Sequence, residues 1–123
     1  MSESIPLGPT LTGTLVARDL EATVAAYCDY LYTTVFEETV VSGELARLWG
    51  KPKLVGTPLV TLCSPSGYPW VRILSNTEVV PAKPFLELGW MALEVLVKDV
   101  DALEQRLQNS PFTIFRPPAN LDV

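Results

Sequence analysis

The sequence predicts an α+β fold made of two related strand–helix–strand units, the second of them incomplete. Three observations lead to this class. Residues 16–22 (VARDLEA) align with residues 96–102 (LVKDVDA) at a constant offset of 80, which indicates that one joint between a strand and a helix is repeated. Short runs of alternating apolar and polar residues surround the first joint, as in half-buried strands. The sequence ends at Val123, before a second full set of strands can form.

The first unit is expected to occupy residues 1–79. Its first strand is predicted over residues 10–17 (TLTGTLVA), where apolar and polar residues alternate. Asp19 is a good N-cap, and Glu21 lies in the following turn, where the helix dipole favours an acid. The apolar residues after this cap recur at helical spacing, which predicts an amphipathic helix over residues 20–36.

Three further strands are expected to complete the first unit. Residues 36–41 (FEETVV) are rich in strand-forming residues, and residues 43–50 (GELARLWG) predict a short helix or a turn. Residues 59–63 (LVTLC) and residues 70–74 (WVRIL) are separated by a Ser-Pro-Ser-Gly turn. We therefore expect these two strands to pair as a hairpin.

Residues 80–89 are expected to be a connector, because Pro81, Pro84 and Gly89 interrupt any regular element there. The partial second unit is expected to occupy residues 90–123. Its expected elements are a strand at residues 90–97 (WMALEVLV), a helix that follows the N-cap Asp99, and the start of another strand at residues 112–115.

Composition limits the possible partners. Hydrophobic residues make up 48% and charged residues 19% of the 123 residues, as in ordinary globular domains. Nine basic against fourteen acidic side chains leave a net charge of −5, so we expect neither nucleic acid nor a membrane as a partner. The sequence contains no histidine, which excludes His-based nucleophile pairs and His metal ligands.

The sequence also predicts a location. No apolar stretch reaches the roughly 18 residues that cross a bilayer, and the N-terminus has no apolar run typical of a secretory signal. Cys28 and Cys63 lie in an expected helix and an expected strand, so we predict reduced, buried thiols. Together these features predict a cytoplasmic protein.

The order of these elements and the repeated joint resemble the vicinal oxygen chelate superfamily, which includes glyoxalases, bleomycin-resistance proteins and extradiol dioxygenases. The segments VARDLEA and VKDVDAL resemble strand endings of that family, and SGELARLWG with LVTLCSPSGYPWVRIL resembles its middle section. The resemblance covers about the whole chain. It implies glyoxalase-like paired βαβββ modules whose sheets curl into a cup, with the second module incomplete here.

In enzymes of that family, metal ligands stand on the cup-facing side of the first and fourth strands of each module. The resemblance places the first-strand ligand at Thr12, or at Thr14 in a register shifted by two residues, and a carboxylate near Arg72. In the second module the ligand position falls at Ala92, with Glu94 two residues later. Only Glu94 can ligate a metal, and one carboxylate is too few. We therefore expect neither a metal nor another cofactor.

Alternation along the strands defines a candidate ligand site. In the fourth strand it directs Val71 and Ile73 toward the helices. It directs Trp70 and Arg72 toward the cup. In the strand expected at residues 90–97, the cup-facing residues are Trp90, Ala92, Glu94 and Leu96. Apolar walls with a few polar groups are typical of small-molecule sites. The candidate ligand-binding residues are Thr12, Thr14, Trp70, Arg72, Trp90 and Glu94.

Four of these six residues also have a purely structural interpretation. Arg72 and Glu94 could pair with each other across the cup, because an isolated buried charge is costly. Trp70 and Trp90 could equally pack in the core or at an interface, since Trp supplies large buried area wherever it lies.

The sequence leaves the function open between two classes, and with it the question whether the protein is an enzyme. The first is a metal-free protein that binds a small, largely apolar or anionic organic molecule in the cup. The second is a metal-dependent lyase or dioxygenase whose ligands come from residues beyond 123 or from a partner chain. A module kept only for dimerisation is a third interpretation. Because the incomplete second unit leaves strand edges unpaired, we expect a homodimer.

Overall fold

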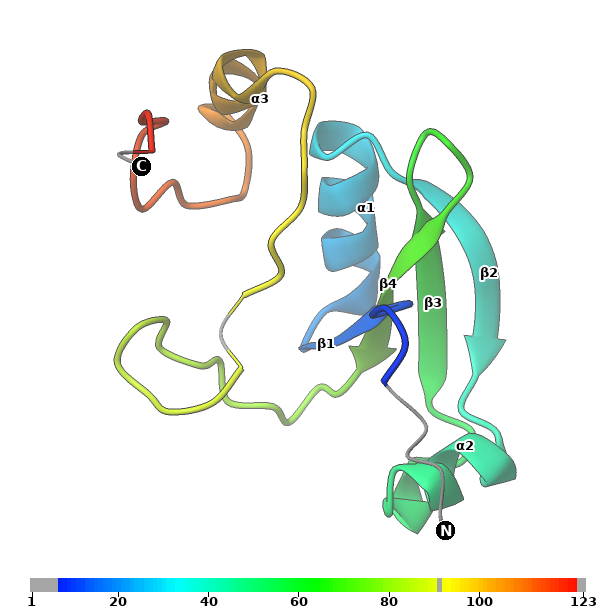
Figure 1. The fold of residues 1–123 in the computed structure, drawn as a ribbon. Helices are drawn as coiled ribbons and strands as arrows, with labels where there is room; N and C mark the ends of the chain where they lie inside the picture. Colours follow the sequence, from blue (N-terminus) through cyan, green and yellow to red (C-terminus); the bar gives the residue numbers. More distant parts are fainter. Residues whose placement is uncertain (1–6, 91, 122–123) are drawn as a thin grey trace, which may run out of the picture.

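The computed structural model describes residues 7–90 and 92–121 and contains one four-stranded sheet with a helix on one face (Figure 1). The strands are β1 (Gly13–Ala17), β2 (Thr34–Val40), β3 (Pro58–Cys63) and β4 (Pro69–Ser75). The helices are α1 (Leu20–Tyr30), α2 (Gly43–Leu48), the 3-10 turn η1 (Pro52–Leu54) and α3 (Val100–Leu107). This mixed architecture confirms the predicted α+β class.

The sheet has the strand order β1-β4-β3-β2. β3 and β4 pair antiparallel, which confirms the predicted hairpin, and β2 pairs antiparallel with β3. β1 lies parallel to β4, with Thr14 opposite Arg72, and its other edge has no partner strand in the described part of the chain. The strand that sequence alternation predicts from residue 10 begins at Gly13.

Both repeated joints form the same cap. The Asp19 carboxylate accepts a hydrogen bond of 3.0 Å from the backbone N–H of Ala22, and the Asp99 carboxylate accepts one of 3.0 Å from that of Ala102. Each bond satisfies one of the backbone donors that a helix leaves free at its start. The predicted cap and the helix after it are therefore confirmed at both joints, whereas the strand before the cap forms only at the first.

α1 ends at Tyr30, earlier than the helix predicted over residues 20–36. Tyr32 has a φ of 58°, which takes the chain out of the helix. Thr34 and Val35 then pair with Cys63 and Leu62 of β3, and a β-branched side chain is well suited to a strand. The competition between helix and sheet is thus decided by the partner strand β3.

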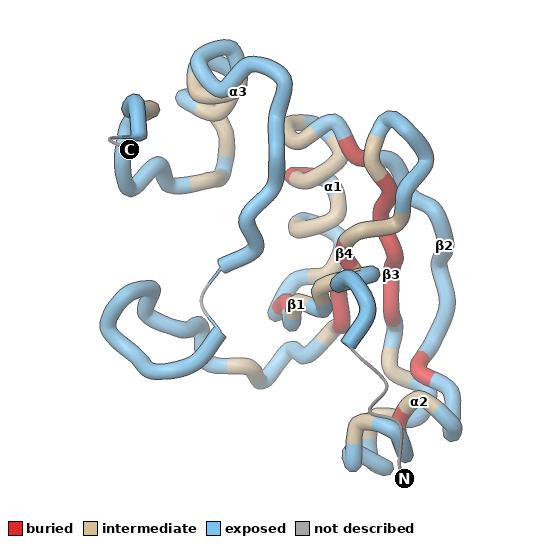
Figure 2. The backbone as a smooth tube through the Cα atoms, viewed as in Figure 1, coloured by how far each residue is buried: buried red, intermediate tan, exposed pale blue. Residues whose placement is uncertain are grey.

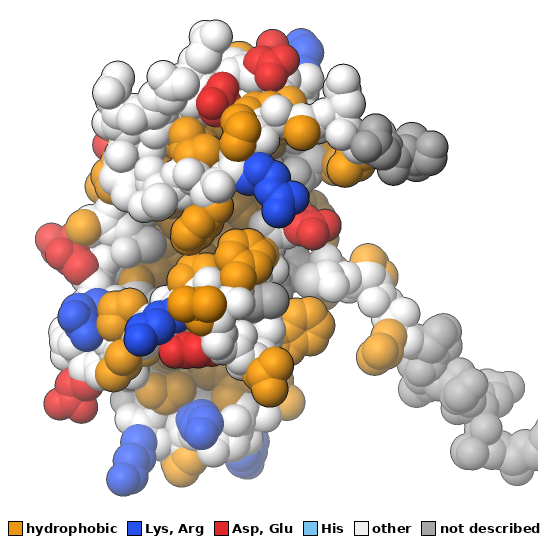
Figure 3. Space-filling view, turned by 90° about the vertical axis from the view of Figure 1, so that its left-hand side faces the viewer, with side chains coloured by type: hydrophobic (Ala, Val, Ile, Leu, Met, Phe, Trp, Pro, Cys, Tyr) orange, Lys and Arg blue, Asp and Glu red, His pale blue; other side chains and the backbone are white. Residues whose placement is uncertain are grey.

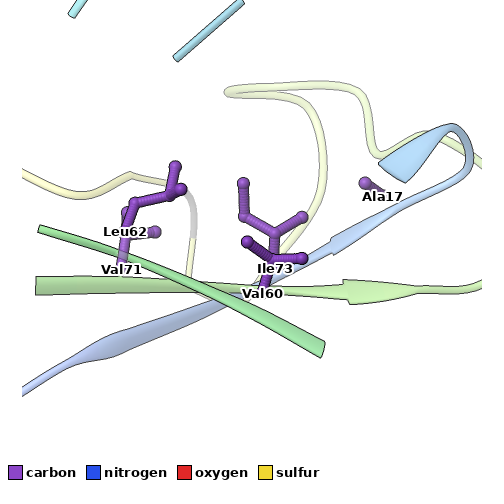
Figure 4. Close-up of a cluster of buried hydrophobic side chains, with 5 residues drawn as sticks. All are labelled: Ala17, Val60, Leu62, Val71 and Ile73. Atoms are coloured by element: carbon purple, nitrogen blue, oxygen red, sulfur yellow. The ribbon is translucent and has the colours of Figure 1, made fainter. Parts of the chain in front are cut away.

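The main core lies between the sheet and α1, and Figure 4 shows its buried side chains. Its buried members are Ala17, Val60, Leu62, Val71 and Ile73. Leu20, Val24 and Tyr27 of α1 pack against them, which confirms that alternation directs Val71 and Ile73 toward the helix. The side chains of Arg72 and Leu74 consequently belong to the opposite face of the sheet.

A smaller core closes one end of that opposite face. Its buried members are Val41, Ala46, Leu59 and Leu74. Trp49, at the C-cap of α2, packs against this cluster together with Leu45 and Leu54. The Ser42 hydroxyl caps α2 by accepting a 3.0 Å hydrogen bond from the N–H of Leu45.

The strand predicted at residues 90–97 does not form: Trp90 and residues 92–97 have no regular secondary structure, and Met91 lies outside the described residues. The start of a strand predicted at residues 112–115 is also absent from the described chain. β1 is held by the parallel strand β4, whereas no strand of a second unit flanks residues 92–97 in the described chain. Without hydrogen-bonding partners a strand is not stable.

Trp90 and residues 92–121, called the C-terminal arm below, run beside α1, form α3 and then turn back toward α3 (Figure 1). Every buried residue of the described chain lies between Ala17 and Leu74, and none lies in the arm (Figure 2). In the described residues, no helix is both long and apolar enough to cross a bilayer.

Candidate functional site

The sheet face opposite α1, called the open face below, carries a row of polar residues. The strand register aligns Thr14 of β1, Arg72 of β4 and Thr61 of β3 side by side. Glu37 of β2 continues the row beyond Thr61. Residues directly opposite each other on neighbouring strands point to the same face, so the four side chains share it. The resemblance places Thr14 on the cup-facing side in its shifted register, and alternation places Arg72 there; the observed register confirms that the two share a face.

Arg72 is the central cation of this row. Its side chain is half-buried, and its Nε is buried without a hydrogen-bond partner in the described part of the chain. The guanidinium lies 5.4 Å from the centroid of the Trp49 ring, within the range of a cation–π contact. The small core around Leu59 and Leu74 holds Trp49 in this position.

The alternative interpretation, in which Arg72 pairs with Glu94, does not agree with the structure. The two side chains make no ion pair, and Glu94 is exposed on the C-terminal arm. Because residues 92–97 run beside α1 and do not form a strand across the cup, Glu94 is not carried to the open face. Among the residues that the structure describes, the buried Nε of Arg72 therefore has no partner.

Trp70 does not face the cup as the sequence predicts. β3 and β4 are out of register by one residue at this point, because Leu62 pairs with Val71 and Cys63 pairs with Pro69. Trp70 is the extra residue of this bulge, and a bulge redirects a side chain. Its ring packs against the main core and lies 6.4 Å from the ring of Tyr27, on the α1 side of the sheet.

The remaining candidates lie apart from Arg72. Thr12 donates a hydrogen bond of 3.3 Å from its hydroxyl to the carbonyl of Pro69, so it ties the start of β1 to β4. Trp90 is fully exposed, at 103%, on the C-terminal arm. Of the six candidates, the structure brings only Thr14 and Arg72 together on the open face.

Two cavities lie between α1 and the C-terminal arm. The smaller has a volume of about 670 Å³ and is lined by Thr14, Trp70 and Trp90 among others. The larger, of about 830 Å³, is lined by Trp70, Tyr68 and Leu96 among others. Leu31, Trp70 and Val95 line both, so the two cavities adjoin. Arg72 and Glu94 line neither of them.

Sequence reasoning did not include Thr61 and Trp49 in the candidate set. Thr61 is the one polar residue within LVTLC, and alternation from Leu59 would have placed it on the open face. Nothing local predicts that Trp49 stacks on Arg72, because the two residues belong to α2 and β4 and meet only through the fold.

The open face does not fit a metal ion. Glu37 is the single carboxylate of the row, and the cationic Arg72 stands in its middle. Across the residues that the structure describes, no group of three or more His, Cys, Asp or Glu side chains is close enough to hold a metal. Both cysteines are free thiols, as predicted, and Cys63 is buried.

One titratable group that lines the smaller cavity has a shifted pKa. Burial raises the pKa of the Tyr27 hydroxyl above its ordinary value, because the phenolate loses hydration inside the protein. Tyr27 lines the smaller cavity and meets the ring of Phe112 edge-on at 5.5 Å. The neutral, apolar form of this ring therefore forms the cavity wall.

The chain has a glyoxalase-like fold. It superposes on the crystal structure of a glyoxalase family protein from Bacillus cereus with a TM-score of 0.56 and 19% identity, over 87% of this chain and 74% of that one. No family model and no curated protein matches the sequence. At this identity the similarity establishes the architecture and leaves the activity to the chemistry of the site.

Proposed function

We propose that this glyoxalase-like protein binds a small organic molecule with an anionic group on the open face, without a metal. The observation that carries the proposal is the buried Nε of Arg72, which has no hydrogen-bond partner in the described chain. Leaving a buried donor unpaired costs about 1–3 kcal/mol, and a bound oxygen would remove this cost. Arg72 is thus a ready donor to a carboxylate or phenolate oxygen.

The neighbours of Arg72 support a ligand with an apolar body. The Trp49 ring supplies a flat wall beside the guanidinium. The hydroxyls of Thr14 and Thr61 flank Arg72 on the same face and can donate to, or accept from, a polar group. Glu37, at the end of the row, disfavours a second negative charge there. A monoanion with an aromatic or aliphatic body fits this arrangement best.

Binding of benzoate and of its neutral analogue benzamide tests this proposal. Replacing Arg72 by Met should weaken benzoate binding by about tenfold or more, since a charge-assisted hydrogen bond contributes roughly 1.5–3 kcal/mol. Benzamide should lose much less. The shift of the Trp49 indole signal in an NMR titration reports on the site itself. Arg47→Met, a change on the exposed surface of α2, is the matched control. Equal benzoate affinity in Arg72→Met and Arg47→Met would overturn the proposal.

The alternative proposal is a metal-dependent lyase or dioxygenase. It requires ligands from residues beyond 123 or from a partner chain, because the row on the open face contains only Glu37 as a metal ligand. Elemental analysis of the purified protein separates the two proposals. One tightly bound Zn, Fe, Mn or Ni per chain would favour the enzyme.

We also propose that the protein is a homodimer. The free edge of β1 can accept another strand, and the C-terminal arm exposes large apolar side chains such as Trp90 and Leu96. A symmetric pair would cover both features. Sedimentation at micromolar concentration should show a dimer, and a monomer alone would contradict this. The cytoplasmic location stays a prediction, which fractionation of the producing cell tests.

A further inference from the structure

The adjoining cavities between α1 and the C-terminal arm form one apolar crevice on the side of the sheet away from Arg72. We propose that this crevice is a second ligand site, which takes a small, mainly aromatic molecule with one hydrogen-bond acceptor. Thr14 borders both places, but neither Arg72 nor Trp49 lines the crevice, so binding in the crevice and binding on the open face can be tested separately.

Each part of the crevice has the volume of a small-molecule site. Its two parts measure about 670 Å³ and 830 Å³, within the roughly 300–1,000 Å³ that ligand sites usually occupy. α1, Trp70 and the turn between β3 and β4 form one wall, and the C-terminal arm forms the other. A space walled on both sides admits a compact molecule more readily than a helix or a strand of another protein.

The walls are rich in aromatic rings. Trp70 lines both parts, Tyr27, Phe112 and Phe115 line the smaller, and Tyr32 and Tyr68 line the larger. In Figure 3, which views the molecule from the side of the arm, hydrophobic side chains gather across the middle of this face. Aromatic rings attract one another at offset or edge-to-face geometry, which favours an aromatic ligand over a purely aliphatic one.

The larger part has few polar groups apart from tyrosine hydroxyls. Ser64 hydrogen-bonds to Ser66 at 2.8 Å, and the Asp99 carboxylate caps α3 through Ala102. The Lys98 amine, which is exposed at the rim, and the hydroxyls of Tyr32 and Tyr68 make no hydrogen bond within the described chain, so each is free to donate to a ligand. Lys98 is the cationic donor among them, so an anionic acceptor on the ligand would be directed toward it.

Contacts with the first unit hold the C-terminal arm in the position in which it forms this wall. Leu93 packs on Gly13, where an added Cβ would lie only 2.6 Å from a methyl carbon of Leu93. Arg106 of α3 donates hydrogen bonds to the carbonyls of Asp29 at 2.5 Å and Tyr30 at 3.2 Å, at the end of α1. These two contacts hold both ends of the crevice wall against the first unit.

Two fluorescent probes with the same ring framework test the site. N-phenyl-1-naphthylamine is neutral, and 1-anilinonaphthalene-8-sulfonate adds one anionic acceptor. Both should bind saturably at one site per chain. Val95→Glu places a charge where both parts of the crevice meet, so it should weaken both probes by roughly tenfold or more. Leu88→Glu, a change at a fully exposed residue that lines neither part, is the matched control.

The pair Lys98→Met and Lys83→Met tests the donor. Because Lys98 is exposed, Lys98→Met should weaken the sulfonate probe by roughly two- to fivefold and leave the neutral probe unchanged. Lys83 lines neither part of the crevice, so Lys83→Met should change neither probe. This selectivity does not arise from a loss of folding, which would weaken both probes alike.

Two substitutions that add a large side chain, one inside the crevice and one outside it, give an independent test of probe binding. Ala102 lines the larger part, and Ala22 is its exposed counterpart in the first joint, outside both parts. Ala102→Phe should lower probe affinity, and Ala22→Phe should not. Equal probe affinity in Val95→Glu and Leu88→Glu would overturn the proposal. An unchanged probe affinity in Val95→Glu, together with loss of the dimer in sedimentation, would also overturn the proposal. This result would assign the crevice to contact between two copies of the chain.

Discussion

The two repeated joints share a sequence pattern but lie in regions that fold differently. Around Asp19 the joint connects a strand to a helix, and the strand residue Ala17 is buried. Around Asp99 the joint connects an irregular segment to a helix, and the equivalent residue Val97 is 41% exposed. The caps are the same in both places, at 3.0 Å.

This difference separates local from non-local causes. A helix and its cap are completed by residues within one or two turns, so both joints form them. A strand is completed only by hydrogen bonds to another strand, and β1 obtains these from β4. Residues 92–97 have similar apolar alternation, but without a partner this alternation does not make a strand.

The largest expected effect on the free energy of unfolding comes from comparing a core residue of the first unit with an exposed residue of the arm. Leu62 is fully buried in the main core, whereas Leu96 is fully exposed on the arm. Replacing Leu62 by Ala should lower the free energy of unfolding by about 2–5 kcal/mol, because it leaves a cavity. Replacing Leu96 by Ala should change it by less than about 0.5 kcal/mol. Chemical denaturation measures both, and similar losses would show that the arm has a core of its own.

The two caps should differ in what they stabilise. Asp19→Ala should lower the free energy of global unfolding by about 1 kcal/mol, because α1 covers the main core. Asp99→Ala should leave the global transition nearly unchanged and increase amide hydrogen exchange within α3 alone. If both variants lower the global transition equally, the two regions unfold as one unit.

The link between the regions can be weakened directly. Arg106 places its guanidinium at the carbonyls that end α1 and 4.5 Å from the Tyr32 ring. Arg106→Gln should reduce the protection of α3 from hydrogen exchange by about 0.3–1 kcal/mol, the usual worth of a cation at a helix C-terminus. Arg116→Gln, on the same arm and without a described hydrogen bond, is the control. Equal protection in both variants would contradict a linking role for Arg106.

The smallest expected effect is a change of folding stability with pH. Burial raises the pKa of Tyr27 in the folded protein above its value of about 10 in the unfolded chain. Below pH 10 the hydroxyl is protonated in both states and adds no pH dependence. Above pH 10 the unfolded chain releases the proton first, so stability should fall as pH rises toward the folded pKa. Thermal melts of Tyr27→Phe should lack this part of the alkaline loss, and an identical alkaline loss in both proteins would contradict it.

The candidate site was predictable only where strand alternation holds. Alternation correctly directs Arg72 to the face that the resemblance gives to Thr14, because β1 and β4 are regular at these residues. It fails for Trp70, where one extra residue in β4 redirects the ring toward α1. No pattern in the sequence marks this bulge. Glu94 was misplaced for a different reason, because its predicted orientation required a strand that has no partner.

The sequence by itself determined the features that depend on near neighbours: the caps at Asp19 and Asp99, the β3–β4 hairpin and the alternation that buries Val71 and Ile73. Only the tertiary structure decided where α1 ends, whether residues 92–97 form a strand, and which residues surround Arg72. Each of these outcomes depends on contacts between residues far apart in the chain. Such contacts exist only after the whole sheet has assembled, because the entropy of closing long loops must first be offset by packing and hydrogen bonds.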